Sequence, residues 1–267
     1  MTEWDAAAYA RISSLQAAMA AEVLALLQFG GDEQVLDVGC GNGTITAQIA
    51  TRVPRGGVTG VDPSREMIAY ATEHFGTAAF PNLRFEVGDA RTLPFHDAFD
   101  RVVSFNALHW VPDQDAALRS IRRATKVTAR AQLRLVVDGE RTSVETAVEE
   151  TRRTPRWAPY FADFRDPYLH LTPARYAAVA ARNGLCVVER SVQDKAWDFG
   201  TRAAFHGFCA VGCVAWTQRL PDALRDAFVD DALENYRRTI GAGPGEDSIF
   251  RFYQMDLTLM RDATRAP

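Results

Sequence analysis

The stretch Val35–Thr44 reads VLDVGCGNGT and decides the fold of this chain. It opens with a short apolar run rich in β-branched residues, which is typical of a buried parallel strand. Three glycines follow at alternate positions, Gly39, Gly41 and Gly43. Glycine accepts positive φ and lets another group approach the main chain closely. Apolar residues then recur every four positions, so we predict a strand, a glycine turn and a helix in this order.

A second expected strand, residues 57–61, ends in an acid, Asp62. Strand, glycine turn, helix, strand and acid form a nucleoside-binding α/β unit, in which the acid accepts hydrogen bonds from ribose hydroxyls. The glycine spacing is G-x-G-x-G, whereas a dinucleotide fold has G-x-G-x-x-G. Asp37 precedes the first glycine, where it would repel a pyrophosphate but suits the ammonium group of S-adenosylmethionine. The residues favour S-adenosylmethionine over NAD, with a glycine-rich turn that binds no ligand as the alternative.

Composition places the chain among globular α/β proteins. Its 267 residues fit one large domain, residues 1–267, or a domain with a cap, and the net charge of −4 gives no basic surface for nucleic acid. We find no apolar run long enough for a membrane span, no signal-peptide pattern at the start, and no C-x-x-C pair.

Cys209 and Cys213 lie one helical turn apart and are better explained as two buried thiols than as metal ligands. We expect a cytoplasmic protein without a metal, acting on a small molecule as a monomer or homodimer.

The alternation of strands and helices continues to residue 137 and then fades. We predict strands at 82–87, 99–105 and 133–137, a helix at 114–125, and later a helix at 173–183, a strand at 185–192, helices within 201–240 and a strand at 248–259. The core is expected to comprise residues 30–138 and 185–267. An amphipathic N-terminal helix, 4–28, and the arginine- and aromatic-rich segment 140–183 are expected to cap the acceptor site.

Four motifs occur in the order that one known family has. They are VLDVGCGNG (35–43), VTGVDPSREMIAYA (58–71), NLRFEVGDARTLPF (82–95) and FDRVVSFNALHWV (99–111). The chain resembles the class I S-adenosylmethionine-dependent methyltransferases. Its SFNALHWV segment, with Tyr9 and Gln16 near the start, is similar to the subgroup of trans-aconitate and juvenile hormone acid methyltransferases.

The resemblance implies a Rossmann-like fold. We expect seven mostly parallel strands with the last one antiparallel, helices on both faces, and a helical and aromatic cap inserted after strand five. It also implies that S-adenosylmethionine is the methyl donor and S-adenosylhomocysteine the product.

The resemblance further implies the cofactor-binding residues: Tyr9, Gln16, Asp37, Gly39, Gly41, Asp62, Pro63, Ser64, Met67, Asp89, Ala90 and Asn106. Asp89 would accept from the adenine amino group, and Asn106 would lie near the methionine moiety. Three of these residues have simpler roles as alternatives. Met67 is also plausible as a core residue of its helix, Ser64 as a helix cap, and Asp89 as a turn former.

Both enzymes of the subgroup methylate a carboxylate, so the resemblance implies O-methylation of a small acid. A carboxylate is ionised at neutral pH and needs no general base. A hydrophobic phenol, hydroxyl or carbon acceptor would need one, and His109 is the candidate for orienting the acceptor or for taking its proton, because it follows strand four at the carboxyl edge of the sheet. Trp110, Trp157 and Tyr160 are further candidate substrate residues, with packing inside the cap as the alternative for the aromatic residues and for His109.

Two departures from the family pattern bear on the acceptor. Residues 125–131, TKVTARA, replace the usual Leu-x-Pro-Gly-Gly turn, and the stretch 205–216 is apolar enough to suit a hydrophobic acceptor better than a tricarboxylate. Arg152, Arg153 and Arg156 stand next to acids and are more simply a solvated helix face, so we leave them out of the site. Alternatives of another class are an NAD-dependent dehydrogenase and a cofactor-binding regulatory protein without catalysis.

Overall fold

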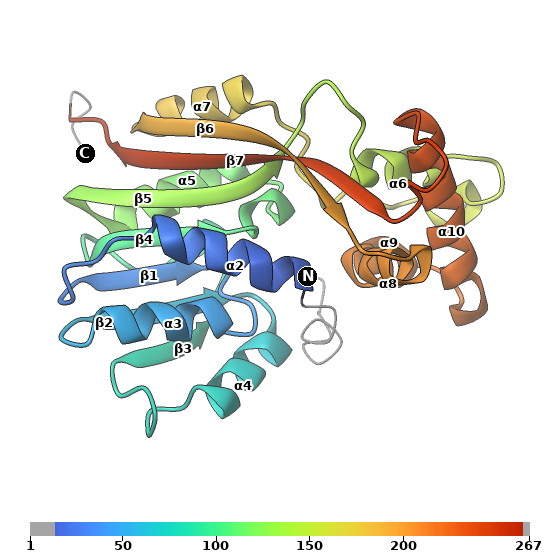
Figure 1. Ribbon diagram of the computed structural model, residues 1–267. Coiled ribbons are helices and arrows are strands. Elements are labelled where there is room, and N and C mark those ends of the chain that lie inside the picture. The colour runs from blue at the N-terminus through green and yellow to red at the C-terminus, as the bar shows by residue number, and fades with distance from the viewer. Residues whose placement is uncertain (1–13, 264–267) are drawn as a thin grey trace.

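A seven-stranded sheet in the order β3-β2-β1-β4-β5-β7-β6 organises the chain (Figure 1). The computed structural model describes residues 14–263, without the side chains of Ser14, Gln16 and Ala17. The strands are β1 Gln34–Val38, β2 Gly57–Asp62, β3 Leu83–Val87, β4 Phe99–Phe105, β5 Thr125–Val137, β6 Leu185–Asp198 and β7 Ile249–Arg261. The pairings among β1 to β5 are parallel, and β7 is antiparallel to both β5 and β6. The predicted Rossmann-like sheet with an antiparallel last strand is confirmed.

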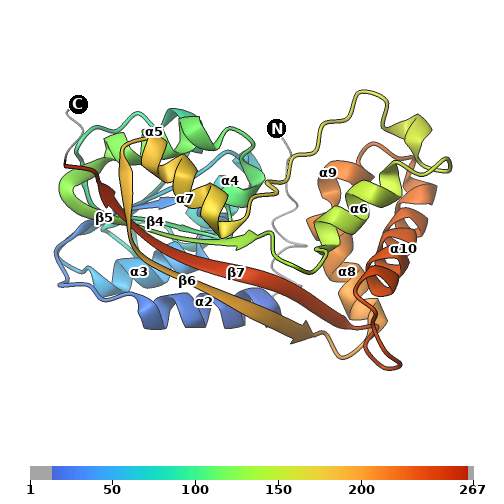
Figure 2. The same ribbon diagram turned by 90° about the horizontal axis from the view of Figure 1, so that it is seen from above.

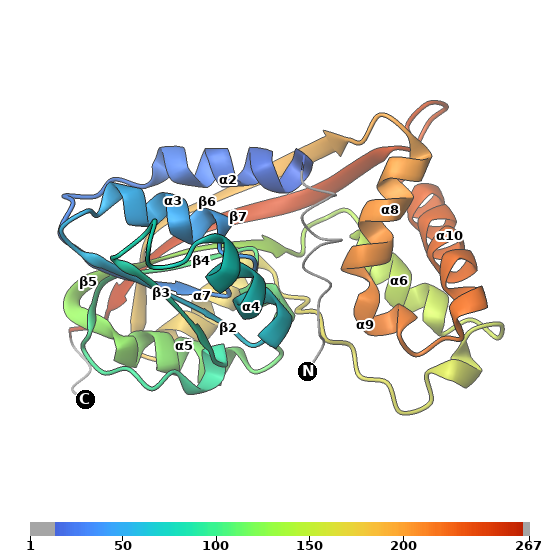
Figure 3. The ribbon, with the colours of Figure 1, turned by 90° about the horizontal axis from the view of Figure 1, so that it is seen from below.

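Helices cover both faces of this sheet. On one face lie α2 Ser14–Leu26 and α3 Thr44–Arg52, and on the other lie α5 Gln114–Ala124 and α7 Pro173–Arg182 (Figures 2 and 3). The helix α4 Arg65–His74 packs against β2 and β3. Each face has its own apolar layer. One is centred on Leu118, Ile121 and Tyr176, the other on Val23 and Ile49.

The cap forms a third apolar cluster beyond one end of the sheet. It contains α6 Val144–Arg152, the short turn η3 Ala158–Tyr160, α8 Arg202–Gly212, α9 Val214–Thr217 and α10 Asp222–Thr239 (Figure 2). Its core is aromatic, with Trp157, Phe161, Trp216, Phe228 and Tyr236 buried together. Within this cluster the Trp216 indole Nε1 donates to the Glu149 carboxylate at 2.7 Å.

The predicted division between core and cap is therefore wrong in two places. Residues 202–239, which we expected in the core, pack against α6 and belong to the cap. The helix α7, which we expected in the cap, packs against α5 and β6 on the sheet. The reason is that both helical stretches have apolar faces, and only long-range packing decides which layer each one joins. The insertion after strand five thus supplies α6 and the short turn η3, and the cap helices α8, α9 and α10 lie between β6 and β7.

The start of β5 also differs from the prediction. Strand β5 begins directly at the end of α5, since Thr125 closes the helix by donating its hydroxyl to the Ile121 carbonyl at 2.8 Å. Residues 125–131 are thus strand, with a pairing irregularity opposite Phe99 to Arg101 in β4. The described part of the N-terminal helix starts at Ser14, so its predicted residues 4–13 lie outside the described residues. Within residues 14–263, no helix is both long and apolar enough to cross a membrane.

Candidate active site

A cavity of about 700 Å³ opens at the carboxyl ends of β1, β2, β3 and β4. This is the edge where open α/β sheets bind their ligands. The cavity brings together ten residues that the sequence predicts for the site: Asp37, Gly39, Gly41, Asp62, Pro63, Met67, Asp89, Ala90, Asn106 and Trp110. Further lining residues that the sequence analysis missed include Ala20, Cys40, Asn42, Thr44, Ile45, Tyr70, Arg91, Val111, Pro112, Pro167 and Ala215.

The glycine loop forms one wall of the cavity. Gly39, Gly41 and Gly43 have φ values of 77°, 54° and 80°, in the left-handed region that favours glycine. A Cβ at Gly39 would lie 2.2 Å from the Ala107 side chain, whereas one at Gly41 would meet no atom within 4 Å. The loop is therefore tightly packed at Gly39, and at Gly41 its main chain is open for a ligand.

Asp62 holds this loop in place. Its Oδ2 accepts the Gly41 amide at 2.9 Å, and its Oδ1 accepts the Ser64 amide at 2.9 Å. The carboxylate is 9% exposed and lines the cavity, so it faces the ligand from a fixed position. Ser64 is buried outside the cavity lining, and its hydroxyl caps α4 by accepting the Met67 amide at 3.3 Å. For Ser64 the structure shows the helix-cap alternative.

Asp37 is a buried acid beside the glycine loop. Its Oδ2 accepts the Thr46 hydroxyl at 2.7 Å. Burial, together with the nearby charge of Asp62, raises the pKa of Asp37 to about 7, although the bond from Thr46 acts in the opposite direction. A cationic group in the cavity would oppose both effects and keep Asp37 ionised.

Asp89 and Asn106 occupy opposite sides of the cavity. The Asp89 carboxylate accepts the guanidinium of Arg91, with an Nη2–Oδ2 distance of 2.5 Å, and this bond lowers the pKa of Asp89. It also accepts the Arg91 amide at 2.8 Å, so Asp89 is a turn former as well as a lining residue. Asn106, at the end of β4, has a φ of 55°. Its Oδ1 accepts a hydrogen bond from the side-chain Nε2 of Gln254 at 3.1 Å. A non-glycine residue in this conformation indicates local strain, which is common at functional sites.

His109 does not line the cavity. It is 5% exposed, and its Nδ1 accepts the Val136 amide at 3.3 Å. Burial lowers the pKa of His109 to about 3, so the ring is neutral at ordinary pH. It packs beside Trp110 and Tyr168, with ring centroids 5.7 and 5.2 Å away. The geometry supports packing beneath the cap and gives no support to a role as base.

Trp157 and Tyr160 also lie away from the cavity. The Trp157 indole donates to Asp231 at 2.8 Å and packs edge-on against Phe228 in the cap core. Tyr160 is 39% exposed on the surface. These two residues therefore form part of the cap, and the packing alternative describes them. Of the aromatic candidates, Trp110 alone reaches the cavity.

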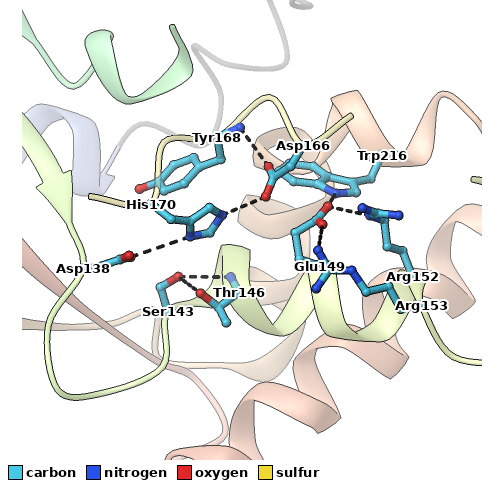
Figure 4. A network of polar contacts seen from close by, with 10 residues as sticks. All are labelled: Asp138, Ser143, Thr146, Glu149, Arg152, Arg153, Asp166, Tyr168, His170 and Trp216. Atoms are coloured by element: carbon cyan, nitrogen blue, oxygen red, sulfur yellow. Dashed lines mark hydrogen bonds and ion pairs between the residues drawn. The ribbon is translucent and has the colours of Figure 1, made fainter. Parts of the chain in front are cut away.

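Polar contacts hold the segments of the cap together, and those of Glu149 are drawn in Figure 4. Arg152 and Arg153 bond to Glu149, at 2.7 and 2.8 Å, and Arg156 bonds to Asp231 at 2.8 Å, so all three arginines have acidic partners. None of the three is among the described residues that line the cavity.

A second contact group in Figure 4 positions one wall of the cavity. His170 Nε2 lies 2.8 Å from Asp166 and Nδ1 lies 3.6 Å from Asp138, and its bonds to Asp138 and Asp166 raise the pKa of His170 to about 10. The Leu169 amide donates to the His109 carbonyl at 2.7 Å. Together these contacts fix the segment that carries Pro167 into the cavity wall. Sequence reasoning did not predict this arrangement, because its members lie in three separate segments of the chain.

Tyr9 lies outside the described residues, and the side chain of Gln16 is also outside them. Their predicted contact with the cofactor therefore stays a prediction. Within residues 14–263, no group of three His, Cys, Asp or Glu residues is arranged to hold a metal ion.

Comparison with known proteins agrees with the geometry. A family described as "Methyltransferase domain" matches residues 35–128. The crystal structure of the YcgJ protein from Bacillus subtilis superimposes with a TM-score of 0.65 at 18% identity, over 92% of this chain and 98% of that one. At that identity the likeness concerns the fold.

Three curated relatives extend the comparison. A putative methyltransferase 235L of Invertebrate iridescent virus 6 is 27% identical over 90% of this chain and 87% of its own. A trans-aconitate 2-methyltransferase of Deinococcus radiodurans is 39% identical over 43% of this chain and 42% of its own. A juvenile hormone acid O-methyltransferase of Bombyx mori is 40% identical over 33% of each chain. The last two matches thus span less than half of those relatives.

The glycine loop, the acids at the ends of β1 and β2, and the sheet order define a methyltransferase fold. The chain carries an S-adenosylmethionine-dependent methyltransferase domain that matches over residues 35–128, and it is similar to the trans-aconitate and juvenile hormone acid enzymes over part of their length.

We predict that Asp62→Ala weakens S-adenosylmethionine binding at least tenfold, equivalent to about 1.4 kcal/mol. The variant loses the bond that holds the Gly41 amide, and with it the carboxylate that we expect to accept the ribose hydroxyls. Titration calorimetry measures the effect, and Asp32→Ala, an exposed acid before β1, serves as the control. An unchanged dissociation constant for Asp62→Ala would refute the placement.

We predict that His109 lowers the free energy of unfolding of the protein in acid. In the unfolded chain His109 binds a proton near its ordinary pKa of 6.5, whereas in the folded protein it binds one only near pH 3. The contribution of neutral His109 to the free energy of unfolding is therefore fully present above pH 6.5 and is lost as the pH falls below that value. Between pH 7.5 and 5, wild type should lose about 2 kcal/mol more unfolding free energy than His109→Asn. Urea denaturation at both pH values measures this difference. Equal losses in the two proteins would show that His109 is not held neutral.

Proposed function

We propose that this enzyme transfers a methyl group from S-adenosylmethionine to a carboxylate oxygen of a small, largely apolar acid. The observation that carries the proposal is the division of one cavity into an acidic end and an apolar end. The acidic end lies at β1, β2 and β3, and the apolar end lies at β4 and the cap.

The acidic end fits the donor. Asp62 offers carboxylate oxygens at the end of β2, where a ribose would lie, and Asp89 stands next to it at the end of β3. Asp37 is a buried acid with a raised pKa, which suits a ligand carrying an ammonium and a sulfonium charge. The open space at Gly41 leaves room for that ligand against the main chain. We assign Asp37, Gly39, Gly41, Asp62, Pro63, Met67, Asp89, Ala90 and Asn106 to donor binding.

The apolar end fits an acceptor that needs no base. Its wall consists of Leu108, Trp110, Val111 and Pro112 after β4, with Pro167 and Ala215 from the segments that cover the cavity. Among the described residues of this wall none is an acid or a base that titrates near neutrality. A carboxylate is already ionised at neutral pH and can attack a methyl group without losing a proton.

The protein's contribution to such a reaction is positional. When bound, S-adenosylmethionine supplies a methyl group on a sulfonium, which is a good leaving group. The glycine loop and Asp62 hold the donor in place. Trp110, Pro167 and Ala215 exclude water and position the acceptor oxygen next to the methyl group of the donor. In-line displacement would then move the methyl group to the oxygen, and the electron pair of the broken bond would stay on sulfur.

The character of the wall favours an apolar acid over a tricarboxylate. Arg91 is the one Lys or Arg among the described lining residues, and it bonds to Asp89 at the donor end. A tricarboxylate would lack cationic partners at the described part of the acceptor end. The likeness to a juvenile hormone acid O-methyltransferase supports the same choice. A phenol or carbon acceptor is less well supported, because His109 is buried beside the Val136 amide and is not in contact with the cavity.

We predict that the protein with S-adenosylmethionine forms methyl esters from apolar carboxylic acids, but not from tricarboxylates or from phenols of matched size. Mass spectrometry of the products and the release of S-adenosylhomocysteine measure the reaction. Ala215→Phe should raise KM for the acid at least tenfold by filling the acceptor end, with S-adenosylmethionine affinity kept. Methylation of phenols but not of acids would overturn the choice of acceptor, and cofactor binding without any product would favour a regulatory protein.

A further inference from the structure

Strand β6 forms a long free edge of the sheet. It runs from Leu185 to Asp198 and, among the described elements, pairs only with β7 (Figure 2). Most of its side chains are exposed from Glu189 onward. An edge strand presents a row of unpaired main-chain donors and acceptors, which is a template for another strand unless something blocks it.

The sequence of this edge complements itself. Residues 189–195 read Glu-Arg-Ser-Val-Gln-Asp-Lys. If a second copy pairs antiparallel about Val192, each Glu189 lies opposite a Lys195, and each Arg190 lies opposite an Asp194. Ser191 then meets Gln193, and the two Val192 side chains meet each other. Opposite charges across a strand pair stabilise it, and like charges directly opposite destabilise it.

The match extends beyond the charged residues. In the same register Val188 lies opposite Ala196, and Val187 lies opposite Trp197, so apolar residues meet apolar ones at both ends. Each pair also shares one face of the sheet, since side chains alternate along a strand with a period of two. The pairing with β7 is irregular between Val187 and Glu189, so the regular part of the edge is the charged segment.

Contacts within the chain leave these charges available. Asp194 bonds to Arg141, yet its side chain is 54% exposed and can accept a second guanidinium. Arg190 and Val192 are exposed on β6. Lys195 is the least available of these charges, since its side chain is 18% exposed and bonds to Glu22 of α2, so Glu189 of another copy would be its second carboxylate partner. The edge therefore carries partners for its own sequence rather than a run of one charge that would repel a second copy.

We propose that β6 is a symmetric dimer interface, in which two copies of this chain pair their β6 strands antiparallel about Val192. The contact is isologous, since each patch binds the same patch on the other copy. It joins the two seven-stranded sheets into one continuous sheet. The donor cavity lies at β1 to β4, away from this edge, so the interface does not cover the active site.

Two opposite substitutions at the symmetry axis test the proposal. Val192 is 43% exposed, so a charged side chain should be tolerated in the monomer. In a dimer, Val192→Lys places two lysines opposite each other, and Val192→Glu places two glutamates there. Sedimentation equilibrium of the full chain should show a dimer for wild type and a dissociation constant at least tenfold weaker for each variant.

Mixing the two variants tests directly whether the two Val192 side chains meet at the symmetry axis. A mixture of Val192→Lys and Val192→Glu should form a heterodimer, because the opposite charges then meet at the axis. Val127→Lys, at a valine of β5 that is 62% exposed, serves as the matched control and should stay dimeric. All variants should bind S-adenosylmethionine as wild type does, which shows that they are folded.

Three results would overturn the proposal. A wild-type protein that stays monomeric at all concentrations has no such interface. Variants that dimerise as strongly as wild type would place the interface elsewhere. Single variants that dissociate without recovery on mixing would mean that the two Val192 positions do not meet.

Discussion

The bonds from Asp62 to the main chain are the constraint on which the site depends. One carboxylate holds the Gly41 amide of the loop after β1 and the Ser64 amide at the start of α4. The ends of β1 and β2 and the entry to α4 are therefore fixed by one residue that also faces the cavity. The loop can take this path because Gly39, Gly41 and Gly43 adopt left-handed conformations. A donor molecule bound there meets a wall that is already in place before it arrives.

The opposite side of the cavity depends on a buried arginine. Arg134 of β5 bonds to Asp256 of β7 at 2.6 Å and to Glu22 of α2 at 3.1 Å. Its carbonyl accepts the Asn106 amide at 2.7 Å and so helps to hold Asn106 in its strained conformation at the end of β4. Such a buried charge costs free energy unless it is paired, so the pairing ties α2 and β7 to the centre of the sheet. Pro167 and Ala215 cover this end of the cavity, next to Trp110 in the segment after β4.

The sequence predicted well which residues of the first βα unit meet at the cavity, because its signals are local. Asp37, the glycines and Asp62 stand at fixed spacings along one βα unit, and the unit alone decides where they lie. The last antiparallel strand followed from the resemblance and is confirmed. Prediction was weaker where packing between distant segments decides. His109, Trp157 and Tyr160 looked like site residues by type, but the cap helices bury or turn them away. The same difficulty placed α7 and the helices after β6 in the wrong layers.

Proton release on donor binding is the most direct test of the central claim, that the acidic end beside Asp37 binds the cationic donor. The pKa of Asp37 is raised to about 7, so the empty protein near pH 7 holds a proton there part of the time. A cationic donor favours the ionised acid and expels that proton. Calorimetry of S-adenosylmethionine in buffers of different ionisation enthalpy should show proton release near pH 7 that vanishes above about pH 9 and in Asp37→Asn. A binding enthalpy that does not depend on the buffer at pH 7 would contradict the account.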